Sequence, residues 1–239
     1  MNNKCIFTYI TGKYDRLINP STVTPGWDYI CFTDNSMLTS DIWDIRPIKP
    51  EDAEIECPKR RANAILTQYN KYIPRSYDIC MIIDGNITIN TNLNEFIDKS
   101  GFSTEKYDML IPKHPDRNCI YDEATAILKL KKDNAVNINS HVSKLNKAGY
   151  PRQQGLHATS LFVLNNKSEK ISKLFNVWHD VYFALSSKRD QMSFDYALWI
   201  LENKGTKINI CPCNFFYNTG NDVLGVYDVI FKRERHIKR

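Results

Sequence analysis

The segment from Asp78 to Asn86 constrains the fold of this 239-residue chain more strongly than any other. Five consecutive apolar residues, Ile79 to Ile83, are followed there by Asp84, Gly85 and Asn86. Such a run predicts a strand that is buried on both faces, as in a parallel sheet. Ligands of open α/β sheets bind just outside the carboxyl ends of the strands. Asp84 is therefore either a turn residue or a ligand for a hard cation beside a diphosphate, with Gly85 letting the backbone bend.

The rest of the chain alternates short apolar runs with helical patterns, which is typical of an α/β sheet. Strands are expected at residues 4–11, 29–33, 42–48, 78–84, 87–89, 107–112, 161–164 and 207–211. Helices are expected from Pro58 onward and at residues 119–131, 135–148, 171–185 and 191–201. We predict a single α/β domain with a mixed, mostly parallel central sheet flanked by helices, and with a helix-rich second half.

Composition gives weaker limits on the class of protein. The net charge is +5, and much of it comes from the tail at residues 231–239, FKRERHIKR. Such a tail is typically solvated or disordered, and it could also contact DNA or anionic lipid. The seven cysteines lack the spacing of a zinc site, so we expect reduced thiols. The sequence contains neither a signal-peptide pattern nor 18 consecutive apolar residues, so we expect a cytoplasmic protein without a transmembrane segment.

Polar groups follow three of the predicted strands. The first strand carries Tyr9 and runs into the loop Gly12-Lys13-Tyr14-Asp15, which could contact a base or ribose. Asp34 ends the second strand, where it could bind a ribose or a base edge, and Asp84 ends the buried run described above. Each of these residues alone is compatible with a simple turn. Acidic residues at the ends of successive strands favour a shared ligand site at one edge of the sheet.

Two further clusters carry groups suited to anions. Lys59, Arg60 and Arg61 open the helix after Pro58, where they are either phosphate ligands or a solvated basic turn. Residues 113–123 contain His114 and Arg117, and Arg117 could clamp a phosphate or a sugar carboxylate. The acidic residues that follow, Asp122 and Glu123, could merely complement the dipole of the next helix.

The second half of the chain adds candidate catalytic groups. His157 precedes a predicted core strand, and Asp190 with Gln191 joins two helices. Asp190 either caps the second of these helices or presents a carboxylate to a sugar. The sequence has no Gly-x-Ser-x-Gly motif, no P-loop and no His-Glu-x-x-His motif, which removes support for the commoner hydrolases, kinases and zinc proteases.

Five motifs, in this order, carry a resemblance to a known family. They lie at residues 9–15, 28–34, 83–87, 113–123 and 189–199. Together they resemble the glycosyltransferase-like family that includes plant mucilage pectin galacturonosyltransferases and bacterial capsule-locus proteins. The resemblance extends from about residue 4 to residue 211, which is nearly the whole chain.

This resemblance implies a GT-A-like single domain, which we expect at residues 1–215, followed by a C-terminal extension at 216–239 with the basic tail. It further implies a glycosyltransferase that moves a sugar from a nucleoside-diphosphate sugar, such as a UDP-sugar, to a glycan of the polysaccharide or capsule type. Asp84 and Asn86 would hold Mn²⁺ or Mg²⁺ in place of the family's Asp-x-Asp motif. Because Asn86 is a neutral ligand, the site would carry less charge than one with two aspartates.

The same resemblance assigns roles to individual residues. The residues expected to bind the nucleotide sugar are Tyr9, Gly12, Tyr14, Asp15, Asp34, Arg60, Arg61, Asp84, Gly85, Asn86, His114, Arg117 and Gln191. Asp190 is the first candidate for the catalytic carboxylate, with Glu123 or His157 as the second. His157 stands where the family commonly has an acidic residue, and the only histidine after Cys211 that could serve as a late metal ligand is His236.

Two alternatives remain compatible with the sequence. The acceptor could be a modified base in DNA, reached through the basic tail. The chain could also be a non-catalytic module that binds a nucleotide sugar or a glycan, with Asn86 and His157 marking a site that has lost its activity.

Overall fold

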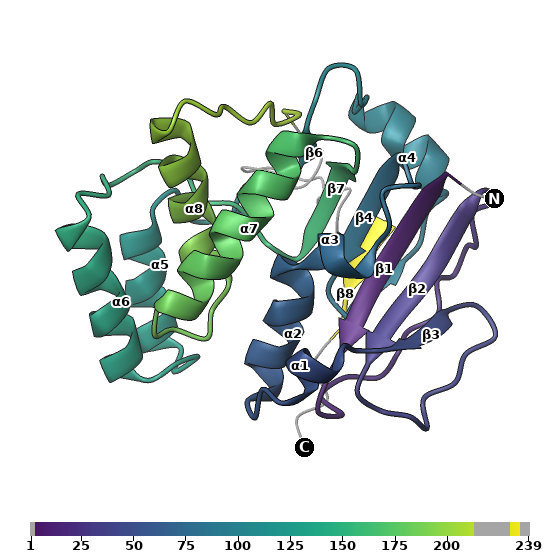
Figure 1. The fold of residues 1–239 in the computed structure, drawn as a ribbon, viewed down its shortest axis with the longest axis horizontal. Helices are drawn as coiled ribbons and strands as arrows, with labels where there is room; N and C mark the ends of the chain where they lie inside the picture. The colour runs from purple at the N-terminus through teal and green to yellow at the C-terminus, as the bar shows by residue number, and fades with distance from the viewer. Residues whose placement is uncertain (1–2, 213–229, 235–239) are drawn as a thin grey trace.

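A six-stranded sheet forms the centre of the protein, whose computed structural model describes residues 3–212 and 230–234 (Figure 1). The strand order is β3-β2-β1-β4-β7-β6. The strands are β1 (Lys4–Ile10), β2 (Trp27–Thr33), β3 (Asp44–Pro47), β4 (Ile79–Ile83), β6 (Met109–Leu110) and β7 (Leu161–Asn165). The first four of these run parallel, whereas β7 is antiparallel to both β4 and β6. The predicted mixed, mostly parallel sheet is therefore confirmed.

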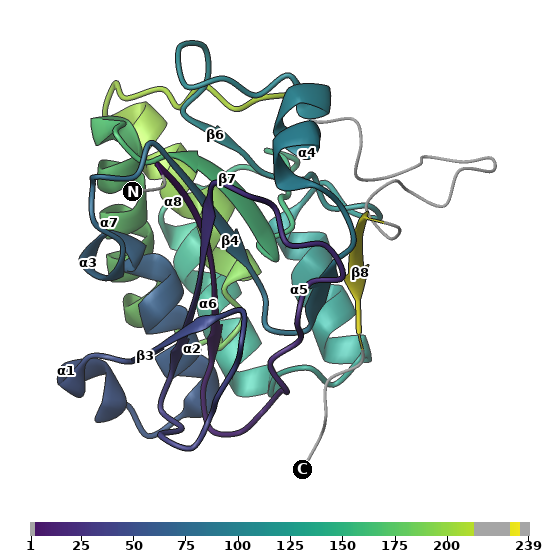
Figure 2. The same ribbon diagram turned by 90° about the vertical axis from the view of Figure 1, so that its right-hand side faces the viewer.

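Helices flank this sheet on both faces (Figure 2). They are α1 (Pro50–Ala53), α2 (Pro58–Thr67), α3 (Tyr69–Tyr72), α4 (Leu93–Ser100), α5 (Ile120–Lys129), α6 (Ala135–Lys147), α7 (Glu169–Ala184) and α8 (Gln191–Asn203). One face is covered by α2, α3 and α7, and the other by α4 with the small sheet of β5 (Ile87–Ile89) and β8 (Phe231–Arg233) (Figure 2). In Figure 1, α5, α6 and α8 gather on the side of α7 that is away from β1–β3.

The alternation of side chains along each strand divides the core into two layers. Phe7 and Ile82 pack with the aromatic residues of α7, including Phe175 and Trp178. Their sequence neighbours Ile6 and Met81 pack on the opposite face with Leu93, Phe96 and Phe231. All five residues of β4 are buried, as the continuous apolar run at 79–83 predicts. This strand is thus fixed from both sides, and Asp84 emerges from a rigid support.

The structure differs from the sequence prediction in two segments, residues 207–211 and the C-terminal tail. The predicted strand at 207–211 is wrong: the chain there forms only an isolated bridge between Ile210 and Met109, because β6 offers no more than two residues to pair with. The tail, in contrast, forms β8, which pairs antiparallel with β5 and buries Phe231 completely. The tail is therefore not wholly solvated, while residues 235–239 lie outside the described residues. Within the described ranges, no helix combines the length and the apolar character needed to cross a membrane.

Candidate active site

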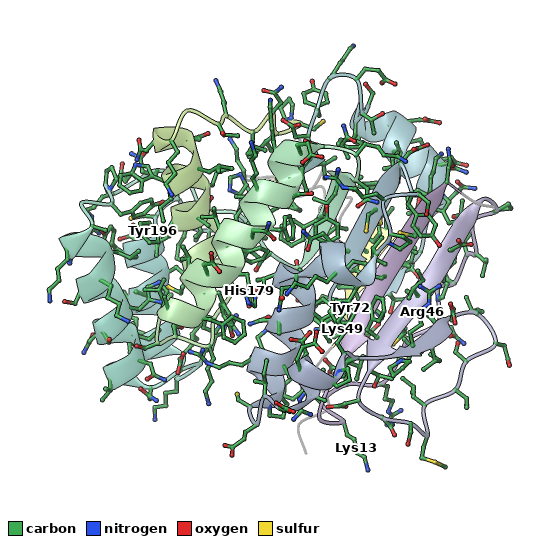
Figure 3. All side chains as sticks on the ribbon, in the orientation of Figure 1. Lys13, Arg46, Lys49, Tyr72, His179 and Tyr196 are labelled. Carbon is green, nitrogen blue, oxygen red and sulfur yellow. The ribbon has the colours of Figure 1, made fainter. Side chains whose placement is uncertain are left out.

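The carboxyl ends of β1, β2 and β4 meet at one edge of the sheet, because these strands are adjacent and parallel. The loop after β1 is tied to the end of β2: the Gly12 amide donates to both carboxylate oxygens of Asp34, at 3.0 and 2.9 Å. The side chain of Asp34 also forms an ion pair with Arg61. Figure 3 shows Lys13, in the same loop, extending outward from this edge of the sheet.

Two aspartates, Asp84 and Asp190, lie at this edge and interact electrostatically; we call this pair the carboxylate centre. Asp84 follows β4, its amide donates to the Ser160 carbonyl at 3.0 Å, and its Oδ1 accepts a 3.1 Å hydrogen bond from the Tyr9 hydroxyl. Asp190 is buried and stands just before α8. Its Oδ2 accepts a hydrogen bond from Thr159 Oγ1 at 2.5 Å, while its Oδ1 lies 3.3 Å from Lys59 Nζ.

The two carboxylates differ in their electrostatic environment. Burial raises the pKa of Asp84, and the charge of Asp190 raises it further, although Lys59 and Arg233 oppose both effects. Burial alone would also raise the pKa of Asp190, but the charges of Lys59 and Arg189 and the bond from Thr159 outweigh it and lower that pKa. Asp190 therefore holds its negative charge, and Asp84 is the carboxylate that gains more from a nearby cation.

Asn86 is suited to hold a cation beside Asp84. Its Nδ2 donates to the backbone oxygen of Glu234 at 2.8 Å, and its own backbone oxygen accepts from the Glu234 amide at 2.7 Å. Its Oδ1 is buried and has no hydrogen-bond partner among the described residues. Carboxylate and amide oxygens are ligands that Mg²⁺ and Mn²⁺ accept, so these two residues fit a divalent cation. No cluster of three or more His, Cys, Asp or Glu residues suited to a metal occurs in 3–212 or 230–234, and His236 lies outside those ranges.

The basic residues at the start of α2 separate into different roles. Lys59 faces the carboxylate centre. Arg60 instead donates to the carbonyl oxygens of Leu185 and Ser186, at 3.0 and 3.3 Å. Its guanidinium also lies over the rings of Tyr182 and Phe183 at the end of α7. Arg61 binds Asp34 and the Ile55 carbonyl. The structure thus brings Lys59 to the two aspartates and places Arg60 and Arg61 on the surrounding loops.

His114, Arg117 and Glu123 form a second cluster. Arg117 Nε donates to the buried Glu123 Oε2 at 2.5 Å, and the His114 ring accepts from the amides of Asp116 and Arg117. Burial and the charge of Arg117 lower the pKa of His114. Because the Glu123 carboxylate is bound to Arg117, its contacts favour a role in orienting Arg117.

His157 forms an isolated antiparallel bridge with Lys113. Its Nδ1 is 2.5 Å from Oδ1 of Asp195, and its carbonyl accepts from Gln191 Nε2 at 2.9 Å. Asp195 is nearly inaccessible to solvent and was not among the residues that the sequence singled out. Its spacing could have indicated this position: Asp195 follows Gln191 by four residues, so both lie on one face of α8.

A cavity of about 510 Å³ lies beside the loop after β1. Its lining combines polar and apolar groups: Ile10, Lys13, Asp15, Arg16, Leu17, Asn19, Thr33, Asn35, Leu38, Thr39, Ser40 and Asp41. Tyr14, from the same loop, is half exposed. The cavity therefore adjoins the ends of β1 and β2, next to Gly12 and Asp34.

The protein has a mixed α/β sheet, and acidic and basic groups gather at the carboxyl ends of its parallel strands. Open α/β proteins bind their ligands at this edge, so the structure indicates a ligand-binding α/β protein. Comparison with family models narrows this class. The model of the TOD1/MUCI70, glycosyltransferase-like domain matches residues 71–220. The matched region is more than half of the chain, so the chain belongs to this family. The matched region contains Asp84, His157, Asp190 and Asp195.

Solved structures give distant similarities. Mouse xyloside xylosyltransferase 1, in its apo form, overlaps with a TM-score of 0.49 and 11% identity, over 98% of this chain and 95% of that one. The galactosyltransferase LgtC, in complex with donor and acceptor sugar analogues, gives 0.45 and 11%, over 90% and 72%. The mannosyltransferase Ktr4p from S. cerevisiae gives 0.43 and 12%, over 82% and 65%. A search of curated protein sequences found no significant match.

Proposed function

We propose that the protein is a glycosyltransferase that moves a sugar from a nucleoside-diphosphate sugar to a glycan acceptor of the polysaccharide or capsule type. The observation that carries this proposal is the carboxylate centre, in which Asp84 and Asp190 face Lys59 and Arg233 at the carboxyl edge of the sheet. Such a transfer needs positive groups to stabilise the departing diphosphate and a fixed negative charge near the cation-like sugar carbon.

The cavity beside the loop after β1 supports a site for the nucleoside. Its mixed lining provides apolar surface for a base and polar side chains, including Asp15 and Asn35, for the hydroxyls of a ribose. Gly12 is held at the rim by Asp34. We assign a uridine nucleotide to this cavity, with Tyr9, Tyr14 and Arg117 as further donor contacts.

Asp84 and Asn86 would hold Mn²⁺ or Mg²⁺ on the diphosphate. When bound, the cation would offset the charge that develops on the leaving phosphate. Lys59 and Arg233 supply fixed positive charge to the same region. Asp190, held ionised by Lys59 and Thr159, would stabilise positive charge on the reacting sugar. Gln191 keeps the start of α8 against the His157 carbonyl.

A thermal-shift screen of nucleoside diphosphates and nucleotide sugars, each with and without Mn²⁺, tests this function. A ligand that binds the native state raises its apparent stability according to affinity and concentration. We expect Asp84→Asn to lose the Mn²⁺-dependent shift and Asp78→Asn, at the exposed start of the same strand, to keep it. An unchanged shift in Asp84→Asn would contradict the role of Asp84.

Product analysis separates transfer from binding alone. With a donor found in the screen, the active enzyme should release the nucleoside diphosphate, and Asp190→Asn should bind the donor but release product more slowly. Donor binding without any release, with or without Mn²⁺, would identify a non-catalytic binding module. The residues at 235–239, on which an interaction with DNA would depend, lie outside the described ranges; salt-sensitive binding of duplex DNA would favour that acceptor.

A further inference from the structure

His157 is fixed by α8 at three points. Its amide donates to Asp195 Oδ2 at 2.9 Å, its ring Nδ1 lies 2.5 Å from Asp195 Oδ1, and its carbonyl accepts from Gln191 Nε2 at 2.9 Å. Phe194 contacts the imidazole edge-to-face, with 5.9 Å between ring centroids. Both the backbone and the ring of His157 are therefore held in one orientation.

The carboxylate of Asp195 also decides which nitrogen carries the proton. An ionised carboxylate only accepts hydrogen bonds, so the neutral imidazole presents N–H at Nδ1 and its lone pair at Nε2. Nε2 makes no hydrogen bond within the described part of the chain, and 13% of the side chain remains exposed. The imidazole is thus arranged as a base with one accessible nitrogen.

The position of His157 relates it to the carboxylate centre. The segment from Leu156 to Ala158 is bridged to the chain at Pro112–His114, where it is extended: the His114 amide donates to Leu156 and the Ala158 amide to Pro112. His157 stands two residues before Thr159, whose hydroxyl donates to Asp190, and its own carbonyl accepts from Gln191, the residue after Asp190. The imidazole therefore lies on the segment that packs against the start of α8, next to the carboxylate centre.

Asp190 itself is poorly arranged to remove a proton. One of its oxygens accepts from Thr159, the other lies beside Lys59, and the residue is buried. We propose that His157 is the general base of the transfer reaction, and that Asp195 is the positioning residue that fixes its ring and tautomer. This proposal rests on the proposed function and gives the two residues separate roles. Asp190 stabilises positive charge on the sugar, and His157 accepts the proton of the acceptor hydroxyl.

The proton and electrons balance as follows. The acceptor hydroxyl gives its proton to Nε2 of His157 while its oxygen forms the new bond to the anomeric carbon. The bond from that carbon to the diphosphate oxygen breaks, and its electron pair leaves with the diphosphate. The resulting imidazolium is stabilised by Asp195 and later returns its proton to water.

The charged groups around His157 predict how the reaction depends on pH. Burial alone would lower the pKa of His157, but the charge and the hydrogen bond of Asp195 raise it above the ordinary value, against the opposing charge of Lys113. Tyr150 also faces Asp195, and its pKa is raised by burial and by that carboxylate. A base must be neutral, so transfer should increase as pH rises through the raised pKa of His157.

The test compares the pH dependence of transfer in three variants. His157→Gln should keep the donor-induced thermal shift, lose about 10²-fold or more in kcat, and lose the rise with pH that His157 produces. Asp195→Asn should lower kcat and move that rise to lower pH, because the raising charge is removed. His179→Gln is the matched control, since His179 of α7 bonds Thr67 at the end of α2, and it should leave kcat and its pH profile unchanged.

The outcomes separate this proposal from the function on which it rests. If the wild-type protein transfers sugar but His157→Gln keeps the wild-type rate and profile, His157 is not the base and the transferase function stands. If Asp195→Asn retains the wild-type profile, Asp195 has no positioning role. Should Asp195→Asn fail to fold, the His157→Gln profile and the NMR titration of His157 in the wild-type protein decide. A wild-type protein that binds no nucleotide sugar overturns the proposed function and the base together.

Discussion

The Gly12 amide donates to both carboxylate oxygens of Asp34, so the loop after β1 is anchored to the end of β2. Gly12 adopts a positive φ of 61°, and a Cβ atom placed on it would lie 2.6 Å from Cβ and Cγ of Pro58. Pro58 begins α2, which also carries Lys59. The backbone at Gly12 therefore sets the distance between the loop beside the cavity and the helix that faces the carboxylate centre.

We expect Gly12→Ala to destabilise the protein by about 2–4 kcal/mol, because left-handed backbone strain adds to the clash with a rigid proline ring. Gly205→Ala is the matched control: Gly205 has a φ of 82° but no atom within 4 Å of its added Cβ, so it should cost only about 1–2 kcal/mol. Urea unfolding of both variants measures the difference. If both variants lost the same free energy of unfolding, the loop would be able to shift away from Pro58 without a loss of stability.

Lys59 and Arg60 are adjacent in sequence, but Lys59 lies beside Asp190 whereas Arg60 binds the backbone after α7. Lys59→Gln removes a fixed charge from the carboxylate centre, and we expect the affinity for the nucleotide sugar to fall about 10- to 100-fold, with little change in stability. Arg60→Gln removes the bonds to Leu185 and Ser186, and should lower stability by about 1–2 kcal/mol while donor affinity changes less than about twofold.

Isothermal titration with the donor found by thermal shift, together with urea unfolding, measures both quantities in both variants. A large loss of donor affinity in Arg60→Gln would restore Arg60 as a donor ligand. If Lys59→Gln bound the donor with the wild-type affinity, Lys59 would not be a donor ligand.

Phe231 anchors β8 in the hydrophobic core. Its side chain is fully buried and packs edge-to-face on Phe96, with 4.9 Å between ring centroids. We expect Phe231→Ala to lower the free energy of unfolding by about 3–5 kcal/mol, because it leaves a cavity under β5 and β8. Lys232→Ala, at the exposed neighbouring position, should cost less than about 0.5 kcal/mol. A cost below about 1 kcal/mol for Phe231→Ala would mean that β8 is dispensable for the fold.

Part of the candidate site is encoded locally, and its position in the fold can be predicted from the sequence. The apolar run at 79–83 has a single plausible structure, and parallel strands necessarily bring Asp34 and Asp84 to one edge. Asp190 is a candidate through the family motif at residues 189–199, and the regular pattern of α8 begins directly after it. In each case the information lies within a few residues of the functional group.

The rest of the site depends on contacts that are distant in sequence. Asp195 is one polar residue within a helical pattern, and its partner His157 is 38 positions away. Arg233 lies in a segment whose charge predicts solvent exposure, yet its strand pairs with β5, and Asn86 bonds Glu234 across 148 positions. Neither propensity nor periodicity specifies such pairings, because they are decided by packing against the finished sheet. The strand predicted at 207–211 is wrong for the related reason that the adjacent edge strand β6 is too short to pair with it.

His141 provides a test of stability against pH that is independent of the active site. It is fully buried on α6, its Nε2 lies 3.1 Å from the Met192 carbonyl, and burial lowers its pKa to about 4. The unfolded chain binds the proton near pH 6.5 and the folded protein does not, so this contribution is complete above pH 6.5 and is lost as pH falls towards 4. We expect the free energy of unfolding to fall by up to about 3 kcal/mol over this range, and His141→Gln to lose that part of the slope. Urea unfolding at successive pH values measures both slopes; since His114 and His179 remain in the variant, an equally steep slope in His141→Gln would assign the effect to them.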